Sequence, residues 1–239
     1  MDISVLCFNI HKGRGWNIRR STFAQLQRHL PNVPADLIFF QEVCGSHVEP
    51  LKARAINWPD SVYGKTRITH KEYYGNLILS KLPIIFSQNM DISMHRYEKR
   101  GLLHAIVRLP HHNESLHLLC VHLGLFSNTR LKQLELIVNY IKKHIPERAP
   151  IILGGDFNDW RSDATKPIIE QMYFQEAFLT SNRAYAKTFP AWAPILKLDR
   201  IYFRGLRVIE VARLTNKPWR HLSDHLGIMA SLNLGNSMI

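Results

Sequence analysis

The feature that most limits the possible folds of this 239-residue chain is an alternation of short apolar runs with amphipathic segments. Runs such as 36–40 and 151–153 are too short for helices and are bounded by Gly, Pro or polar residues, so they predict strands. Between such runs, the spacing of Leu134, Ile137 and Ile141 predicts an amphipathic helix. This alternation favours an α/β or mixed sandwich over a helix bundle or an all-β barrel.

The predicted elements extend along most of the chain. We expect strands at 3–10, 36–40, 76–80, 84–86, 102–109, 116–121, 151–153, 198–203 and 226–234. We expect helices at 18–30, 48–58, 131–141 and 165–172, and irregular structure over the aromatic, proline-rich stretch 185–198. No linker, internal repeat or low-complexity tract divides the sequence. It therefore predicts one domain over 1–234, followed by a disordered tail at 235–239.

The charge balance points to partners that carry phosphate. The chain has 31 Lys and Arg against 19 Asp and Glu, a formal net charge of +12. A positive field of this size attracts nucleic acid, anionic lipid or a phosphorylated small molecule, and it does not discriminate among them. The basic residues also fit a solubilising surface, because they form no long block of like charge.

Cysteine use and the N-terminal sequence predict a cytoplasmic protein. Cys7, Cys44 and Cys120 are too few and too scattered for a disulfide framework or a Cys-rich zinc site. The N-terminus has an acid at position 2 and enters a strand at once, unlike a signal peptide. No apolar run approaches the length of a membrane span. We expect a soluble cytoplasmic monomer without a transmembrane segment.

The stretch PIILGGDFNDW at 150–160 is the richest in candidate chemistry. A short apolar run stops at Gly154 and Gly155 and is followed by Asp156 and Asn158. In an extended backbone that spacing points both side chains to one side, where a carboxylate and an amide can converge on one ligand. Taken alone, the stretch also fits an ordinary Gly/Asp/Asn turn.

Other polar residues fall at strand ends in the same way, and strand ends are where scaffolds of this class gather their chemistry. These residues are Asn9, Glu42, His122, Asp156, Asn158, Asp199, Asp224 and His225. Asn9 and Glu42 together suit Mg²⁺ or Mn²⁺, which takes one or two carboxylates and completes its shell with water and substrate phosphate.

Asp199 and His225 fit a carboxylate–imidazole pair, in which the acid orients the ring and favours its protonated form. The triplet Ser223, Asp224, His225 raises the alternative of a serine hydrolase. That alternative is disfavoured, because no Gly-x-Ser-x-Gly elbow precedes a helix and Ser223 lies very close in sequence to His225.

Six motifs in order resemble those of the endonuclease/exonuclease/phosphatase superfamily. They are NIHKG at 9–13, QEV at 41–43, VHLGL at 121–125, GGDFNDW at 154–160, LDRIY at 198–202 and LSDH at 222–225. RGLLHA at 100–105 and WRHLSDH at 219–225 are most similar to a bacterial branch of predicted hydrolases, the YbhP-like proteins.

The resemblance implies a four-layer α/β/β/α sandwich with two facing mixed sheets, as in DNase I, and metal-dependent hydrolysis of phosphate esters by in-line attack of water. It implies metal ligation by Asn9 and Glu42, with Asp224 added to that shell, and Mg²⁺ as the cofactor, with Mn²⁺ as the substitute. It implies catalytic roles for His122, Asp156, Asn158, Asp199 and His225. The pair Asp156 and Asn158 would position the phosphate and the water, and Asp199 and His225 would act at the reacting phosphate.

Three further residues are weaker candidates for contacts with substrate phosphate: His11, Arg100 and Arg130. A solvated surface role is an equal alternative for the two arginines. His11 stands where many nucleases of the superfamily carry an acid, two residues after the first Asn. This departure favours a site with one metal over a site with two.

The superfamily fixes the reaction better than the substrate. Basic and aromatic residues alternate at 96–100, 187–192 and 217–220. Such loops could stack bases and follow a phosphate backbone, which we favour, or rest on an anionic membrane with Trp192 and Trp219 at its interface. The alternatives are therefore a nuclease, a phospholipid or sphingolipid phosphodiesterase or phosphatase, and a basic nucleic-acid-binding module that is not an enzyme.

Overall fold

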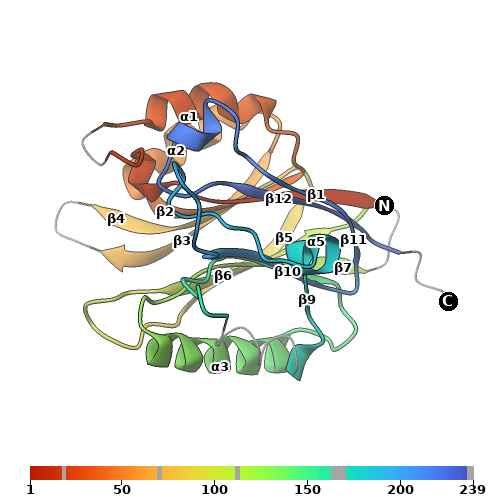
Figure 1. Cartoon of the computed structure of the whole chain (residues 1–239). Helices are drawn as coiled ribbons and strands as arrows, with labels where there is room; N and C mark the ends of the chain where they lie inside the picture. The colour runs from red at the N-terminus through yellow and green to blue at the C-terminus, as the bar shows by residue number, and fades with distance from the viewer. Residues whose placement is uncertain (18–19, 69–71, 111–113, 163–170, 236–239) are drawn as a thin grey trace.

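The computed structural model describes residues 1–17, 20–68, 72–110, 114–162 and 171–235 and contains two six-stranded sheets (Figure 1). The first sheet has the order β11 (Arg207–Arg213), β12 (Ile228–Asn233), β1 (Asp2–Asn9), β2 (Leu37–Cys44), β4 (Tyr73–Ser80), β3 (Asp60–Ile68). The second has the order β5 (Ile84–Asp91), β6 (Gly101–Arg108), β7 (Ser115–His122), β8 (Ile151–Asp156), β10 (Asp199–Arg204), β9 (Gln175–Glu176). The helices are α1 (Phe23–His29), α2 (Gly45–Arg54), α3 (Ser127–His144) and α5 (Ala177–Asn182), with short 3-10 turns η1 (His11–Gly13), η2 (Leu30–Asn32) and η3 (Trp219–His221).

Three apolar clusters hold four layers together. Side chains from both sheets, including Val5, Phe39, Leu118 and Ile152, fill the space between the sheets. The apolar stripe of α3 packs on the outer face of the second sheet, while α1 and α2 cover the outer face of the first (Figure 1). The predicted four-layer α/β/β/α sandwich is therefore confirmed.

Each sheet contains one parallel pair of strands at its centre, β1 with β2 and β7 with β8, and the other pairs are antiparallel. Parallel neighbours end at the same edge of a sheet, and an antiparallel neighbour begins there. The ends of β1, β2, β7 and β8 and the start of β10 consequently lie at one end of the sandwich, on the side toward which β1 runs from the labelled N-terminus in Figure 1.

The prediction that the strand at 151–153 stops at the two glycines is wrong, because β8 continues through them to Asp156. Gly155 is needed for close approach: a Cβ atom there would lie 1.9 Å from the carbonyl oxygen of Val121 on β7. The glycines therefore permit the tight β7–β8 pairing that carries Asp156 to the sheet edge.

Several boundaries also differ from those predicted. The strands β3 and β11 were not predicted. β11 is largely exposed, and a register irregularity between Val208 and Glu210 interrupts its alternation of apolar residues. The first helix begins at Phe23, later than predicted, and residues 18–19 lie outside the described ranges. Most of the predicted helix at 165–172, and the predicted tail beyond residue 235, also lie outside them. Within the described ranges, every helix is too short or too polar to cross a bilayer.

We predict that Gly155→Ala destabilises the protein strongly. Its backbone φ is +153° and the added methyl group meets the Val121 carbonyl, so β7 and β8 must separate. The expected loss of unfolding free energy is about 3 kcal/mol or more, measured by urea denaturation. Gly235→Ala is the matched control, because nothing lies within 4 Å of its position. Equal stability of the two variants would show that the close approach is not required.

Candidate active site

The pairing of three strands places the central side chains together. Asp156, at the end of β8, is the Cα partner of His122 on β7 and of Asp199 on β10. All three side chains are at least nine-tenths buried. The sheet register alone therefore brings residues 34 and 43 positions from Asp156 in sequence to its two sides.

Asp199 and His225 form the predicted carboxylate–imidazole pair. The ring Nδ1 of His225 lies 2.9 Å from Asp199 Oδ2, and both side chains are buried. The ring of Phe189 covers the imidazole, with ring centroids 5.1 Å apart. The Asp199 backbone N–H donates to the Thr188 hydroxyl at 3.4 Å.

The electrostatics of this pair favour an imidazolium. Burial lowers the pKa of His225, but the charges of Asp199 and Asp156 outweigh burial and raise it to about 10. His225 therefore carries a proton on each ring nitrogen at neutral pH. Its Nδ1–H is directed at Asp199, and its Nε2 lies 3.8 Å from Asp156 Oδ2.

One oxygen of Asp156 is the meeting point of the cluster. Its Oδ2 accepts a hydrogen bond from Asn9 Nδ2 at 3.0 Å and lies 3.5 Å from His122 Nε2. Burial, reinforced by the charge of Asp199 and opposed by His225, raises the pKa of Asp156 to about 7. Burial together with Arg100 lowers the pKa of His122 to about 3, so that this ring is neutral. A buried carboxyl that titrates near neutrality is poised to take up a proton.

The expectation of an extended backbone from Asp156 to Asn158 is wrong. The strand ends at Asp156, and Asn158 has a left-handed φ of +51°. The Asn158 N–H donates to Asp156 Oδ1 at 2.9 Å, and its side-chain Nδ2 donates to the Leu123 carbonyl at 2.9 Å. Residues 156–158 therefore form a turn and also contribute to the site, because the turn holds the Asp156 carboxylate in place.

Glu42 lies at a bulge inside β2, with a left-handed φ of +56°. Burial would raise its pKa, but the charges of His122, Lys12 and His11 lower it to about 2, so that it is ionised. Its Oε2 is 3.5 Å from Lys12 Nζ.

Glu42 and Asn9 fit a hard divalent cation. The buried Glu42 Oε2 accepts no hydrogen bond from any residue that the structure describes. Asn9 Oδ1 accepts the His11 N–H at 3.0 Å and keeps a second lone pair. One carboxylate and one amide oxygen form the sparse donor set that Mg²⁺ accepts.

A second group could also hold a metal, since ligand atoms of Asp156, Asp199 and His225 lie within 4.8 Å of one another. A protonated His225 offers no lone pair there, however. The chemistry of the donors therefore favours the oxygen pair at Glu42 and Asn9.

Asp224 and His11 lie at the edge of the cluster. The Asp224 carboxylate is 3.4 Å from His11 Nδ1, and its Oδ1 lies 3.2 Å from the Ser223 hydroxyl oxygen. The same hydroxyl donates to the Asn9 carbonyl at 2.7 Å. His225 turns its Nε2 toward Asp156 and not toward Ser223, so the arrangement is not that of a serine-hydrolase triad.

The two arginines differ. Arg100 is half-buried beside Glu42 and His122, with its Nε donating to the Leu123 carbonyl at 3.0 Å. The structure does not bring Arg130 to the site, because its guanidinium is buried, donates to the carbonyls of Gly124 and Leu125, and lies 3.7 Å from Asp159. Arg130 therefore supports the loop after β7.

The sequence did not indicate two residues of the site, Lys12 and Asn76. Lys12 pairs with Glu42, and the buried Asn76 on β4 donates from Nδ2 to the carbonyls of Gly101 and Cys120 in the other sheet. Asn76 thereby joins the two sheets at the site. The signal that the sequence offered for Asn76 was its position, as a polar residue, at the start of an apolar run.

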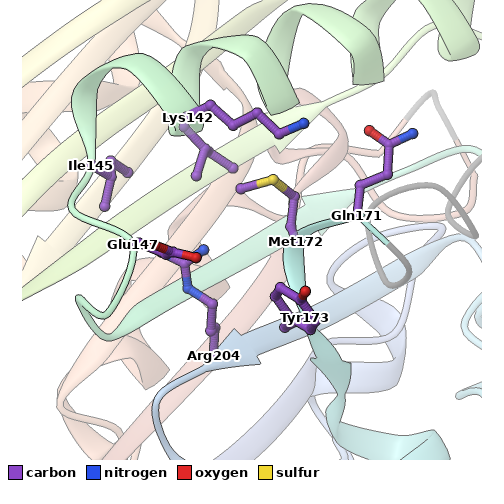
Figure 2. Close-up of a pocket in the computed structure, with 8 residues that line it drawn as sticks. Lys142, Ile145, Glu147, Gln171, Met172, Tyr173 and Arg204 are labelled. Atoms are coloured by element: carbon purple, nitrogen blue, oxygen red, sulfur yellow. The ribbon is translucent and has the colours of Figure 1, made fainter.

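Figure 2 shows a different pocket of about 230 Å³, at the C-terminal end of α3. Lys142, Ile145, Met172 and Arg204 line it, together with a single carboxylate, Glu147. The 18 residues of α3 span about 27 Å and separate it from the loop after β7, so this pocket is remote from the Asp156 cluster.

The fold and the site together define a hydrolase of phosphate esters with a DNase I-like sandwich. The chain belongs to the endonuclease/exonuclease/phosphatase family, whose model matches residues 8–225. It is 36% identical to YbhP of Escherichia coli K12 over 98% of this chain and 97% of the relative.

The chain is also similar to more distant relatives and to solved structures. Tyrosyl-DNA phosphodiesterase 2 of Danio rerio is 25% identical over 83% of this chain and 58% of the relative. Among solved structures, the endonuclease/exonuclease/phosphatase of Bacteroides vulgatus has a TM-score of 0.81 at 20% identity, covering 98% of this chain and 99% of that one. A Danio rerio TDP2 complexed with a single-strand DNA product has a TM-score of 0.75 at 21% identity, covering 97% and 99%. These structural likenesses establish the shared fold.

We predict that the charge on His225 depends on Asp199. In the metal-free protein, the C2–H resonance of His225 should stay at its protonated position between about pH 5 and pH 9, and Asp199→Asn should bring the titration down into that range. Because the pKa is raised in the folded state, the pair stabilises the fold fully below about pH 6.5, and this stabilisation is lost as pH rises toward 10. A wild-type His225 that titrates near pH 6.5 would contradict this assignment.

Proposed function

We propose that the protein is a metal-dependent phosphodiesterase, specifically a nuclease, that hydrolyses its substrate by in-line attack of water. The observation that carries this proposal is the convergence of Asn9, His122 and His225 on one oxygen of Asp156, with Asp199 behind His225. This arrangement offers a proton acceptor and a fixed positive charge within one buried cluster.

Glu42 and Asn9, with Asp224 added, would hold a divalent cation, Mg²⁺ or Mn²⁺, which would neutralise charge on the phosphoryl and leaving oxygens. The low pKa of Glu42 keeps its carboxylate available over the physiological range. The Asn9 amide binds Asp156 through its nitrogen, and its oxygen is thereby turned away from that carboxylate.

Asp156 and Asn158 hold and activate the attacking water. The Asp156 carboxyl, with its pKa near 7, accepts a proton from water at Oδ2. The turn hydrogen bond from the Asn158 N–H fixes Oδ1, so the carboxylate does not rotate during the reaction.

His225 supplies a positive charge and is not the general base. As an imidazolium it donates from Nε2 to a phosphoryl oxygen and stabilises the negative charge that develops in the transition state. Asp199 holds its Nδ1–H and fixes the ring. The neutral His122 on the other side of Asp156 donates a hydrogen bond from its ring N–H to the leaving oxygen.

Nucleic acid is the substrate class that we favour. The net charge of +12 suits a polyanion, and the relatives include a protein named for phosphodiester cleavage at DNA. We also propose that residues 1–234 act as one domain and as a monomer. We place the protein in the cytoplasm, because its three cysteines are free, as in a reducing compartment.

One observation favours a lipid substrate as the second candidate. Leu125 and Phe126 are adjacent, 58% and 70% exposed, and directly follow the β7 end that carries His122. Trp192 is also exposed and could enter a membrane interface. Trp219, the other aromatic residue of this alternative, is partly buried against Phe8.

We predict that Glu42→Ala, Asp156→Ala and His225→Ala each lower kcat/KM for a phosphodiester at least about 100-fold at fixed Mg²⁺, with thermal unfolding still cooperative. Glu42→Ala should also weaken Mn²⁺ binding, measured by calorimetry. Glu49→Ala, an exposed acid on α2 paired with Lys52, is the matched control and should match the wild type. Unchanged turnover in the site variants, or nucleic-acid binding without any turnover, would favour the non-enzymatic binding module.

The proposed substrate class is tested with a panel of candidate substrates, each assayed with Mg²⁺, Mn²⁺ or a chelator. The panel contains plasmid DNA, RNA, bis-p-nitrophenyl phosphate, phosphatidylglycerol vesicles and sphingomyelin vesicles. Nucleic acid should be cleaved with either metal and not with the chelator. Turnover of the lipids alone would replace the nuclease with a lipid phosphodiesterase.

A further inference from the structure

A small polar cavity opens beside Glu42 and His122. Its walls come from β2, from the β3–β4 hairpin and from the segment before β6, with Lys12, Thr66, Tyr74, Lys99 and Arg100 as the other principal lining residues. We call it the lysine cavity. Its volume is about 160 Å³, room for roughly five water molecules. It is therefore large enough for one small charged group.

The charge of the lysine cavity suits an anion. Three cations, Lys12, Lys99 and Arg100, face a single carboxylate, Glu42, across its walls. Arg100 is fixed in place by hydrogen bonds from Nε to the Leu123 carbonyl and from a terminal nitrogen to Glu98, at 3.0 and 3.3 Å. Glu98 pairs with Arg100 and Glu42 pairs with Lys12, so the three cations outnumber the two nearby carboxylates by one, and the Arg100 guanidinium is held in one place.

The neutral walls are also held in place. The Thr66 hydroxyl donates to the Tyr74 carbonyl at 3.1 Å, and the Tyr74 ring lies 5.5 Å from Lys12 Nζ. Asn76 joins this wall to the second sheet through its hydrogen bonds to β6 and β7. The cavity therefore has a fixed shape next to the reacting centre.

We propose that the lysine cavity binds a second phosphate of the substrate, the one that flanks the phosphate being hydrolysed. The inference rests on the proposed function and narrows it to substrates with phosphates in series, which a nucleic-acid strand provides. Lys99 and Lys12 contact the flanking phosphate, and Arg100 supplies the field that attracts it. A phosphodiester with only one phosphate leaves the cavity unused.

The test compares thymidine dinucleotides that differ only in a terminal phosphate: TpT, pTpT and TpTp. Dissociation constants are measured by calorimetry in EDTA at one salt concentration, and kcat/KM is measured separately with Mg²⁺. In the wild type, one of the two phosphorylated dinucleotides should bind about tenfold or more tightly than TpT. Lys99→Met should reduce that ratio to about one or two, and Lys99→Arg should restore most of it.

Lys52→Met is the charge-matched control, because Lys52 pairs with Glu49 on α2 and not with any residue of the cavity. It should keep the wild-type ratio, which separates a local contact from a general loss of positive charge. Equal binding of all three dinucleotides by the wild type, or an unchanged ratio in Lys99→Met, would overturn the lysine cavity as a phosphate site. A retained ratio without turnover of any dinucleotide would support the cavity and overturn the proposed nuclease.

Discussion

The structure of the site depends on the register of β8 between β7 and β10. This register makes Asp156 the neighbour of both His122 and Asp199, and Gly155 permits the close backbone contact on which it relies. A shift by one residue would turn the Asp156 side chain to the opposite face of the sheet. Strand pairing therefore places Asp156, His122 and Asp199, while the turn at Asn158 and the segment before β12 add the remaining contacts of the cluster.

The same geometry concentrates charge where water is largely excluded. Asp156, Asp199 and His225 are all buried, and an unpaired buried charge would cost several kcal/mol. The imidazolium between two carboxylates offsets that cost and gives the site a fixed positive charge. Burial still leaves Asp156 with a raised pKa. The same ion cluster therefore contributes to stability and to the proposed function, because the charges that reduce the cost of burial are those that would act on the phosphoryl group.

The amount that could be predicted from sequence differs by element. The apolar runs located the inner strands, and the position of Asp156, Asp199 and His225 after or before such runs located their cluster. The exposed strand β11 was not predicted because it lacks apolar periodicity. The role of Asn76 was not predicted because a polar residue at the start of an apolar run does not reveal its partners in the other sheet. For Arg130, the residue type suggested a contact with substrate phosphate. Only the structure shows that its buried guanidinium donates to backbone carbonyls instead.

The most direct test of this account is the anomalous diffraction of Mn²⁺ in crystals of the full chain soaked at near-neutral pH. The account predicts one strong peak, bounded by the Glu42 carboxylate and the Asn9 side-chain oxygen, while His225 stays bonded to Asp199. A peak held instead by Asp156, Asp199 and His225 would contradict it, since a metal there requires His225 to lose the proton on which the proposed chemistry depends.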